Sequence, residues 1–255
     1  MQITTTGLVL REIKTGEADR ILTVFTQDYG VITAIAKGSM RMKNKLFHAT
    51  SLFCYSEFIL YEGKSMYTVN EASVKEVFFG LRNRVEAVAL AMYLAELTST
   101  VSLERTDAKA QLKLLLNAFY FISENKRPLQ YIKAVYELRT LSETGYMPDL
   151  VACKDCAQYE GGKFYFDLLE GYLLCQSCAI KRGKEPNLDP AALAAMRHII
   201  FVEPAKLYAF TLPNLALMNL YLIVDGYTLN QIDKPLKTRD FLLSVLPNLI
   251  NEETT

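Results

Sequence analysis

Four of the five cysteines in this chain form two C-x-x-C pairs whose spacing suits a metal ion. The first pair is Cys153 and Cys156, the second is Cys175 and Cys178, and residues 157–174 separate them. Two intervening residues let both thiolates of a pair turn toward one ion, and four thiolates complete the tetrahedral shell of zinc. Because no coordination position stays open for water or substrate, the pattern predicts one structural zinc ion. The alternatives are buried free cysteines or a redox pair, but a redox pair accounts for only one C-x-x-C.

The residues around the cysteine pairs support this interpretation. Two short segments, 163–167 and 171–174, are expected to pair as a hairpin that returns the second pair to the first. The fifth cysteine, Cys54, lies between Phe53 and Tyr55 and is predicted to be a core residue.

The chain offers little for catalysis. Its only histidines, His48 and His198, do not begin the H-x-E motif of a zinc deaminase. No phosphate-binding P-loop, dinucleotide-binding glycine motif or G-x-S-x-G turn occurs. Carboxylates such as Glu160 and Asp167 stand apart in the sequence and are expected to be solvated. The sequence therefore predicts a protein that is not an enzyme and has no catalytic residues.

A stretch without acidic residues runs from Tyr29 to Ser56 and gathers basic ones. Its cations are Lys37, Arg41, Lys43 and Lys45, followed by His48. Flexible cations beside an aromatic residue such as Phe47 suit nucleic-acid phosphates with some base stacking, without sequence readout. The alternative is a solvated charged loop.

The periodicity of the chain separates a β region from an α region. Strands are expected over 4–12, 20–26, 30–37, 53–61 and 65–72, with a connection at 38–50 long enough for a short helix. Five short strands with an insertion after the third predict a small closed barrel of the OB type, although a five-stranded SH3-like barrel has a similar pattern. Helices are expected over 85–95, 112–122 and 128–145, and again after Pro190.

The predicted fold class is therefore α+β and multidomain. An N-terminal five-stranded OB-fold barrel at 1–76 would bind DNA, and an α-helical domain at 77–255 would carry an inserted four-cysteine zinc knuckle at 150–183.

Composition limits where nucleic acid could bind. Lys plus Arg and Asp plus Glu each number 28, so the net charge is zero and a binding surface must be a local patch.

The longest apolar helix candidate begins near Arg84 but carries Glu86 and Glu96, so it is amphipathic rather than membrane-spanning. With no secretory or membrane segment visible, the expected location is the cytoplasm.

Several segments carry a family resemblance. Near the N-terminus they are Thr6-Gly7-Leu8-Val9-Leu10, Gly16-Glu17-Ala18-Asp19-Arg20-Ile21-Leu22-Thr23 and Ala36-Lys37-Gly38. Later ones are Tyr136-Glu137-Leu138-Arg139, Gly145-Tyr146-Met147-Pro148-Asp149-Leu150 and Pro235-Leu236-Lys237-Thr238-Arg239-Asp240-Phe241-Leu242. In this order, and in register over nearly the whole chain, they resemble the RecO family of bacterial recombination mediators.

The resemblance implies an N-terminal OB-fold, a helical domain and a zinc motif that some members lack. It also implies binding of single- and double-stranded DNA, annealing of complementary strands, partnership with RecR, and contact with the C-terminal tail of single-stranded DNA-binding protein to load RecA. Such a protein would be cytoplasmic and associated with the bacterial nucleoid. The candidate nucleic-acid contacts are then Arg20, Lys37, Arg41, Lys43, Lys45 and Phe47.

This sequence departs from the family pattern at one place that matters for binding. Where the family usually has Arg- and Lys-rich sequence after Ala36-Lys37-Gly38, this chain has Ser39-Met40-Arg41-Met42, so fewer phosphate contacts are expected. The leading hypothesis is a recombination mediator that binds and anneals DNA. The alternative is a protein–protein adaptor that contacts DNA only within a partner complex.

Overall fold

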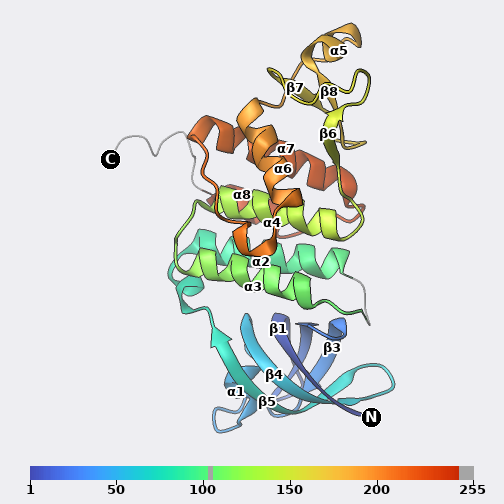
Figure 1. The fold of residues 1–255 in the computed structure, drawn as a ribbon. Coiled ribbons are helices and arrows are strands. Elements are labelled where there is room, and N and C mark those ends of the chain that lie inside the picture. The colour runs from blue at the N-terminus through green and yellow to red at the C-terminus, as the bar shows by residue number, and fades with distance from the viewer. Residues whose placement is uncertain (103–105, 247–255) are drawn as a thin grey trace. The chain divides into compact units, whose positions relative to one another are not determined.

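A computed structural model describes residues 1–102 and 106–246 (Figure 1). The contacts of the chain divide it into two compact units, one from Met1 to Lys126 and the other from Arg127 onward. The first unit contains a β-barrel and two long helices, and the second contains the remaining helices and a small sheet. The domain boundary expected after residue 76 stays a prediction.

Five strands form the barrel of the first unit. They are β1 (Gln2–Thr15), β2 (Asp19–Thr26), β3 (Gly30–Ala36), β4 (Cys54–Glu62) and β5 (Tyr67–Val77). They close in the order β1-β2-β3-β5-β4, and every neighbouring pair is antiparallel except β3 with β5. The short helix α1 (Leu46–Ala49) lies in the connection between β3 and β4. The predicted OB-type barrel, rather than an SH3-like one, is confirmed.

Alternation along the strands builds the barrel core. In β2, Leu22 and Val24 are buried, and in β3, Ile32 and Ala34 are buried in the same cluster. Successive side chains of a strand point to opposite faces, so every second residue of these strands enters the interior.

The seam between β3 and β5 is short. These strands pair only where Ala34 faces Tyr67 and Ile35 faces Thr68. Residues 31–33 therefore pair with β2 alone among the described strands, and one edge of β3 lies open beside the turn from β4 to β5.

Two helices and a 3-10 turn complete the first unit. They are η1 (Phe79–Asn83), α2 (Val85–Val101) and α3 (Lys109–Ser123). The backbone N–H of Ala108 donates to Gln27 O at 2.8 Å, so the start of α3 is bonded to the β2–β3 turn. The ring of Phe119 meets those of Phe53 and Phe78 edge to face, with centroids 5.1 and 5.6 Å away.

The second unit combines helices with a three-stranded sheet. Its elements are α4 (Leu129–Glu143), β6 (Asp149–Cys153), β7 (Phe164–Phe166), β8 (Tyr172–Cys175), α5 (Gln176–Lys181), α6 (Pro190–Phe201), η2 (Pro204–Lys206), α7 (Asn214–Gln231) and α8 (Arg239–Val245). Strand β8 lies between β6 and β7 and is antiparallel to β7, which confirms the predicted hairpin. Within the described ranges, no helix is long and apolar enough to cross a membrane.

A fully buried lysine lies at the centre of the second unit. Lys133 Nζ lies 2.7 Å from Glu137 Oε1 and 2.6 Å from Asp225 Oδ1, which joins α4 to α7. At the start of α8, Arg239 Nη2 reaches the same Asp225 carboxylate at 2.6 Å. Because an uncompensated buried charge is strongly destabilising, these four side chains specify how α4, α7 and α8 pack.

Burial and ion pairing shift the pKa values of this cluster in opposite directions. Burial alone would lower the pKa of Lys133, but the charges of Glu137 and Asp225 outweigh it and raise that pKa. Burial would raise the pKa of Asp225, but Lys133 and Arg239 outweigh it and lower that pKa. Because the pKa of Asp225 is lower in the folded protein, its ionised carboxylate stabilises the fold at pH values above the unfolded-state pKa. That stabilisation is lost as the pH falls through the lower, folded pKa, so it is present in full at neutral pH.

Replacing the buried lysine tests this cluster. We expect Lys133→Met to lower the free energy of unfolding of the second unit by about 3–5 kcal/mol, because it leaves two carboxylates without their shared cation. Lys113→Met, at an exposed position of α3, is the matched control and should change stability by less than about 0.5 kcal/mol. Chemical denaturation of both variants measures the difference. Equal stability of the two would show that the cluster does not specify the packing.

Candidate metal centre and nucleic-acid surface

The four paired cysteines meet at one point of the second unit. The sulfur atoms of Cys153, Cys156, Cys175 and Cys178 all lie within 4.8 Å of one another, and those of Cys156 and Cys175 are 3.6 Å apart. Cys156 is exposed and the other three are buried. Four sulfur donors from two turns fit the tetrahedral shell of a soft metal ion and fill every position of it.

Backbone hydrogen bonds shape the first cysteine turn. Cys153 ends β6, and its carbonyl accepts from Ala157 N at 2.9 Å while its own N–H donates to Gln158 O at 2.9 Å. Ala157 adopts a left-handed conformation with φ of 58°, which closes the turn. Lys154 N donates to Leu173 O at 2.8 Å, so the turn is held beside β8, the strand that ends at the third cysteine.

Hydrogen bonds with neighbouring groups shift the pKa values of the thiols. A hydrogen bond with Ser177 lowers the pKa of Cys175 to about 6, whereas the hydrogen bond with Cys175 raises the pKa of Cys178 to about 12. Such close thiols resist simultaneous ionisation, because each new thiolate repels those already formed. A bound cation removes this conflict, since the thiolate is the form that binds metal. The donor set therefore fits the expected ion.

Charged side chains fasten the two cysteine turns to each other. Arg182 follows α5 and pairs with Asp155 inside the first C-x-x-C, with Nε 2.8 Å from Oδ2 and a second, parallel hydrogen bond from Nη2 to Oδ1. From α6, Arg197 donates to Leu150 O at 2.8 Å and to Tyr159 O at 2.9 Å. The knuckle is thus bonded to the helical part of its own unit.

The residues for which the sequence predicted no functional role mostly have structural ones. Cys54 is buried as predicted, and burial raises the pKa of its thiol. His198 Nε2 lies 3.1 Å from Lys206 O on the surface. Glu160 is exposed as expected, and Asp167 is partly exposed. Asp167 Oδ1 accepts the backbone N–H groups of residues 169 and 170, each at 3.0 Å, so this carboxylate also holds the local turn.

Metal analysis tests the thiol cluster. We expect about one metal ion per chain in protein purified without chelator, and clearly less in Cys175→Ser, which removes one of four donors. Cys54→Ser makes the same chemical change outside the cluster and should keep the full metal content. Elemental analysis for zinc and iron provides the measurement. A wild-type chain with far less than one ion would overturn the assignment.

The connection between β3 and β4 presents four exposed cations. They are Lys37, Arg41, Lys43 and Lys45. None of them forms an ion pair with a residue in the part of the chain that the structure describes. Cations without internal partners are available to an external anion, which agrees with the sequence hypothesis but does not test it.

Polar contacts that sequence reasoning missed hold this connection in place. Gly38 has φ of 64°, and its N–H donates to Asp19 Oδ1 at 2.6 Å. Asn44 bridges the connection, donating to Gly38 O at 2.9 Å and accepting from Leu46 N at 2.9 Å. The glycine after the third strand was the available signal for an ordered turn.

Arg20 differs from the other candidate contacts. Only 7% of it is exposed, and its Nη1 donates to Phe47 O at 2.8 Å and to Thr50 Oγ1 at 2.9 Å. Its Nε lies 3.2 Å from Glu12, and the guanidinium stands 5.2 Å from the centre of the half-buried Phe47 ring. Arg20 therefore holds the β3–β4 connection on the barrel. The Phe47 ring already contacts a cation of the protein itself, the guanidinium of Arg20.

These features define a class of protein: an OB-type barrel joined to a helical unit that carries a four-thiol metal knuckle. Comparison with known proteins narrows that class. The family model described as "Recombination protein O N terminal" matches residues 1–78, and the one described as "Recombination protein O C terminal" matches residues 82–240.

Curated relatives agree with the family models. A DNA repair protein RecO of Acetivibrio thermocellus is 36% identical over 239 residues, which is 93% of this chain and 95% of that protein. The protein of the same name from Alkaliphilus metalliredigens is 37% identical over 178 residues, 70% of this chain and 72% of its own. The chain belongs to the RecO family, as the sequence resemblance predicted.

Proposed function

We propose that this protein is a non-enzymatic recombination mediator in DNA repair. It binds single- and double-stranded DNA, anneals complementary strands and helps load RecA onto strands coated by single-stranded DNA-binding protein. The observation that carries the proposal is the group of four exposed cations on one connection of an OB-type barrel. Family membership and the name of the relatives, DNA repair protein RecO, support the biological role.

Family membership supports the proposed partners and location. RecR and the C-terminal tail of single-stranded DNA-binding protein are the proposed protein partners, and the bacterial cytoplasm, close to the nucleoid, is the proposed location. The metal is proposed to be a single zinc ion on Cys153, Cys156, Cys175 and Cys178, because sulfur-only tetrahedral sites favour it. Its role is structural, since the protein supplies all four ligands.

The chemistry of the cation-bearing connection explains how binding could promote annealing. Its contacts would go mainly to phosphates, because Phe47 is the only aromatic residue between positions 38 and 50 and the chain has no Trp. Contact with phosphates leaves most base edges free for pairing. Neutralising phosphate charge also reduces the repulsion between two strands that must meet.

Salt dependence of DNA binding tests the proposal. If about three to five phosphates are neutralised, the log–log slope for a single strand should be roughly −2 to −3.5, from about −0.7 per contact. Changing Lys37, Arg41, Lys43 and Lys45 together to Ala should flatten this slope and weaken binding regardless of sequence. Fluorescence anisotropy of the isolated chain at several salt concentrations gives both quantities.

A variant of equal charge provides the control. Alanine at the exposed lysines 75, 109, 113 and 126 of the same unit should leave the slope unchanged. If the first quadruple variant binds as the parent does, the surface lies elsewhere, for example around Lys181, Arg182 and Lys184. If the isolated chain binds no DNA at all, the adaptor hypothesis is favoured.

A further inference from the structure

Three leucines lie on the outer side of α7 (Asn214–Gln231), a helix of the second unit (Figure 1). Leu215 is 82% exposed, Leu222 57% and Leu229 44%. They recur at every seventh residue, so they share one side of the helix. Together they form a leucine stripe about 21 Å long, at a rise of about 1.5 Å per residue.

Apolar groups fill the gaps in the leucine stripe. The half-buried Met218 lies between the first two leucines. Between the last two, Gly226 has no side chain, and Leu168 from the β7–β8 turn takes up that place, because a Cβ on Gly226 would stand 3.1 Å from Leu168 Cδ1. The apolar surface is therefore continuous along the helix.

The opposite side of α7 is already packed inside its own unit. Leu220 and Val224 are fully buried, and the buried Asp225 pairs with Lys133 of α4. Because Asp225 is the only charged residue of the helix, α7 has no charged side to present to water. A helix that is apolar all round is normally buried all round, so the leucine stripe points to a partner.

The missing charge limits what this partner can be. The outward positions of α7 are all uncharged: Asn214, Leu215, Met218, Asn219, Leu222, Gly226, Leu229, Asn230 and Gln231. Such a face offers no ion pair to a polyanion or to a charged peptide. Two copies of it, by contrast, can meet without repulsion between like charges.

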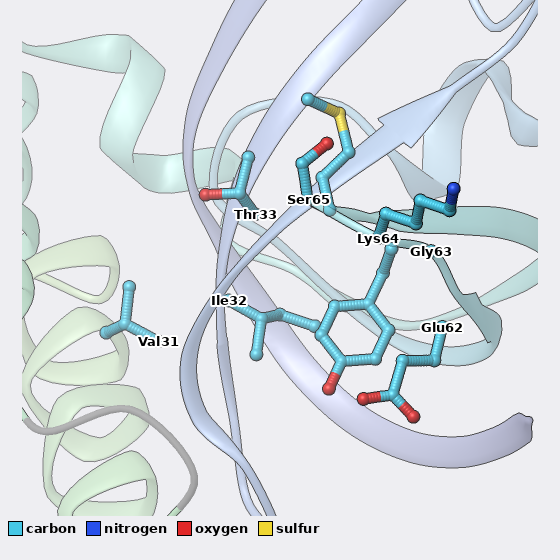
Figure 2. Close-up of a pocket in the computed structure, with 9 residues that line it drawn as sticks. Val31, Ile32, Thr33, Glu62, Gly63, Lys64 and Ser65 are labelled. Carbon is cyan, nitrogen blue, oxygen red and sulfur yellow. The ribbon is translucent and has the colours of Figure 1, made fainter.

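The pocket beside the β4–β5 turn offers a different kind of surface. Its volume is about 130 Å³, and the exposed Glu62 and Lys64 are among the residues that line it (Figure 2). Pockets for drug-sized ligands measure about 300–1,000 Å³, so this one is too small to receive the side of a helix. The surface that matches the leucine stripe on a second copy is its own leucine stripe.

The spacing of the leucine stripe is complementary to itself. Leu215 and Leu229 each lie seven residues from Leu222. In two antiparallel helices with a two-fold axis at Leu222, Leu215 therefore meets Leu229 of the second copy, and Leu229 meets Leu215. A two-fold interface uses the same patch on both subunits, and a seven-residue repeat is the one with which paired helices interlock.

We propose that the leucine stripe of α7 pairs antiparallel with the leucine stripe of a second copy, which makes the protein a two-fold dimer through its second unit. One pair of helices makes a small interface, so we expect a dissociation constant on the order of 10 µM. Each copy contributes its own barrel, so the dimer would hold two strands if the proposed DNA binding is correct. The association itself does not depend on DNA.

Sedimentation equilibrium of the full chain without DNA tests the dimer. Leu222→Glu places two carboxylates opposite each other at the two-fold axis and should weaken dimerisation by at least about tenfold. Val85→Glu makes the same kind of change at another exposed helical position, 60% exposed in α2, and should leave the association unchanged. Circular dichroism establishes that both variants are folded. A wild type that is still monomeric at about 100 µM, or a Leu222→Glu variant that dimerises as the wild type does, would overturn the proposal.

A pair of variants tests the antiparallel arrangement. Leu215→Glu and Leu229→Lys should each dimerise poorly alone, because each sets a charge against a leucine. In an equimolar mixture, Glu at 215 of one copy meets Lys at 229 of the other, and the remaining contact is leucine against leucine, so a heterodimer should form. No gain of dimer on mixing would contradict the pairing and leave the stripe to a partner of another kind. Failure of DNA binding would overturn the proposed function without touching this result.

Discussion

A cation removed from water needs partners inside the protein, and this constraint organises both units. In the barrel, Arg20 is buried and divides its hydrogen bonds between Phe47 O and Thr50 Oγ1, with Glu12 nearby. In the helical unit, Lys133 finds its partners on α4 and α7. Each cluster fixes a geometry, because moving one partner away would leave the other as an uncompensated buried charge. The cation-bearing connection is held on the barrel by the first cluster, and the helices behind the metal knuckle are aligned by the second.

The same constraint separates residues that hold the fold from residues whose charge stays exposed. Several side chains in the segments of family resemblance point inward: Glu137 pairs with Lys133, and Arg239 with Asp225. Arg139 donates to three carbonyls where α6 ends, those of residues 199, 200 and 202. These cations are already satisfied. The exposed cations of the β3–β4 connection and Lys64 lack internal ion-pair partners among the described residues, so their charge is directed to solvent or to a polyanion.

Sequence predicted the features that local spacing determines. Two C-x-x-C pairs place four thiols together because each pair needs only one tight turn and the hairpin between them is short. Strand alternation located the barrel, since inward residues recur at every second position. Contacts between residues far apart in the sequence could not be predicted from local spacing. Lys133 and Asp225 are 92 positions apart, and nothing in either neighbourhood indicates the pairing. Arg20 stays a predicted DNA contact, but its burial could not be predicted because that burial depends on a connection 27 to 30 residues further on.

In the proposed mode of binding, the barrel holds DNA by its phosphates and leaves most bases available for pairing. The most direct test mixes labelled complementary strands with and without the protein, with no nucleotide present, at a protein concentration where binding is established by anisotropy. We expect pairing to be accelerated without ATP and the acceleration to disappear as salt is raised, in parallel with binding. An unchanged pairing rate while DNA is demonstrably bound would contradict annealing by this protein and favour an adaptor that acts only within a partner complex.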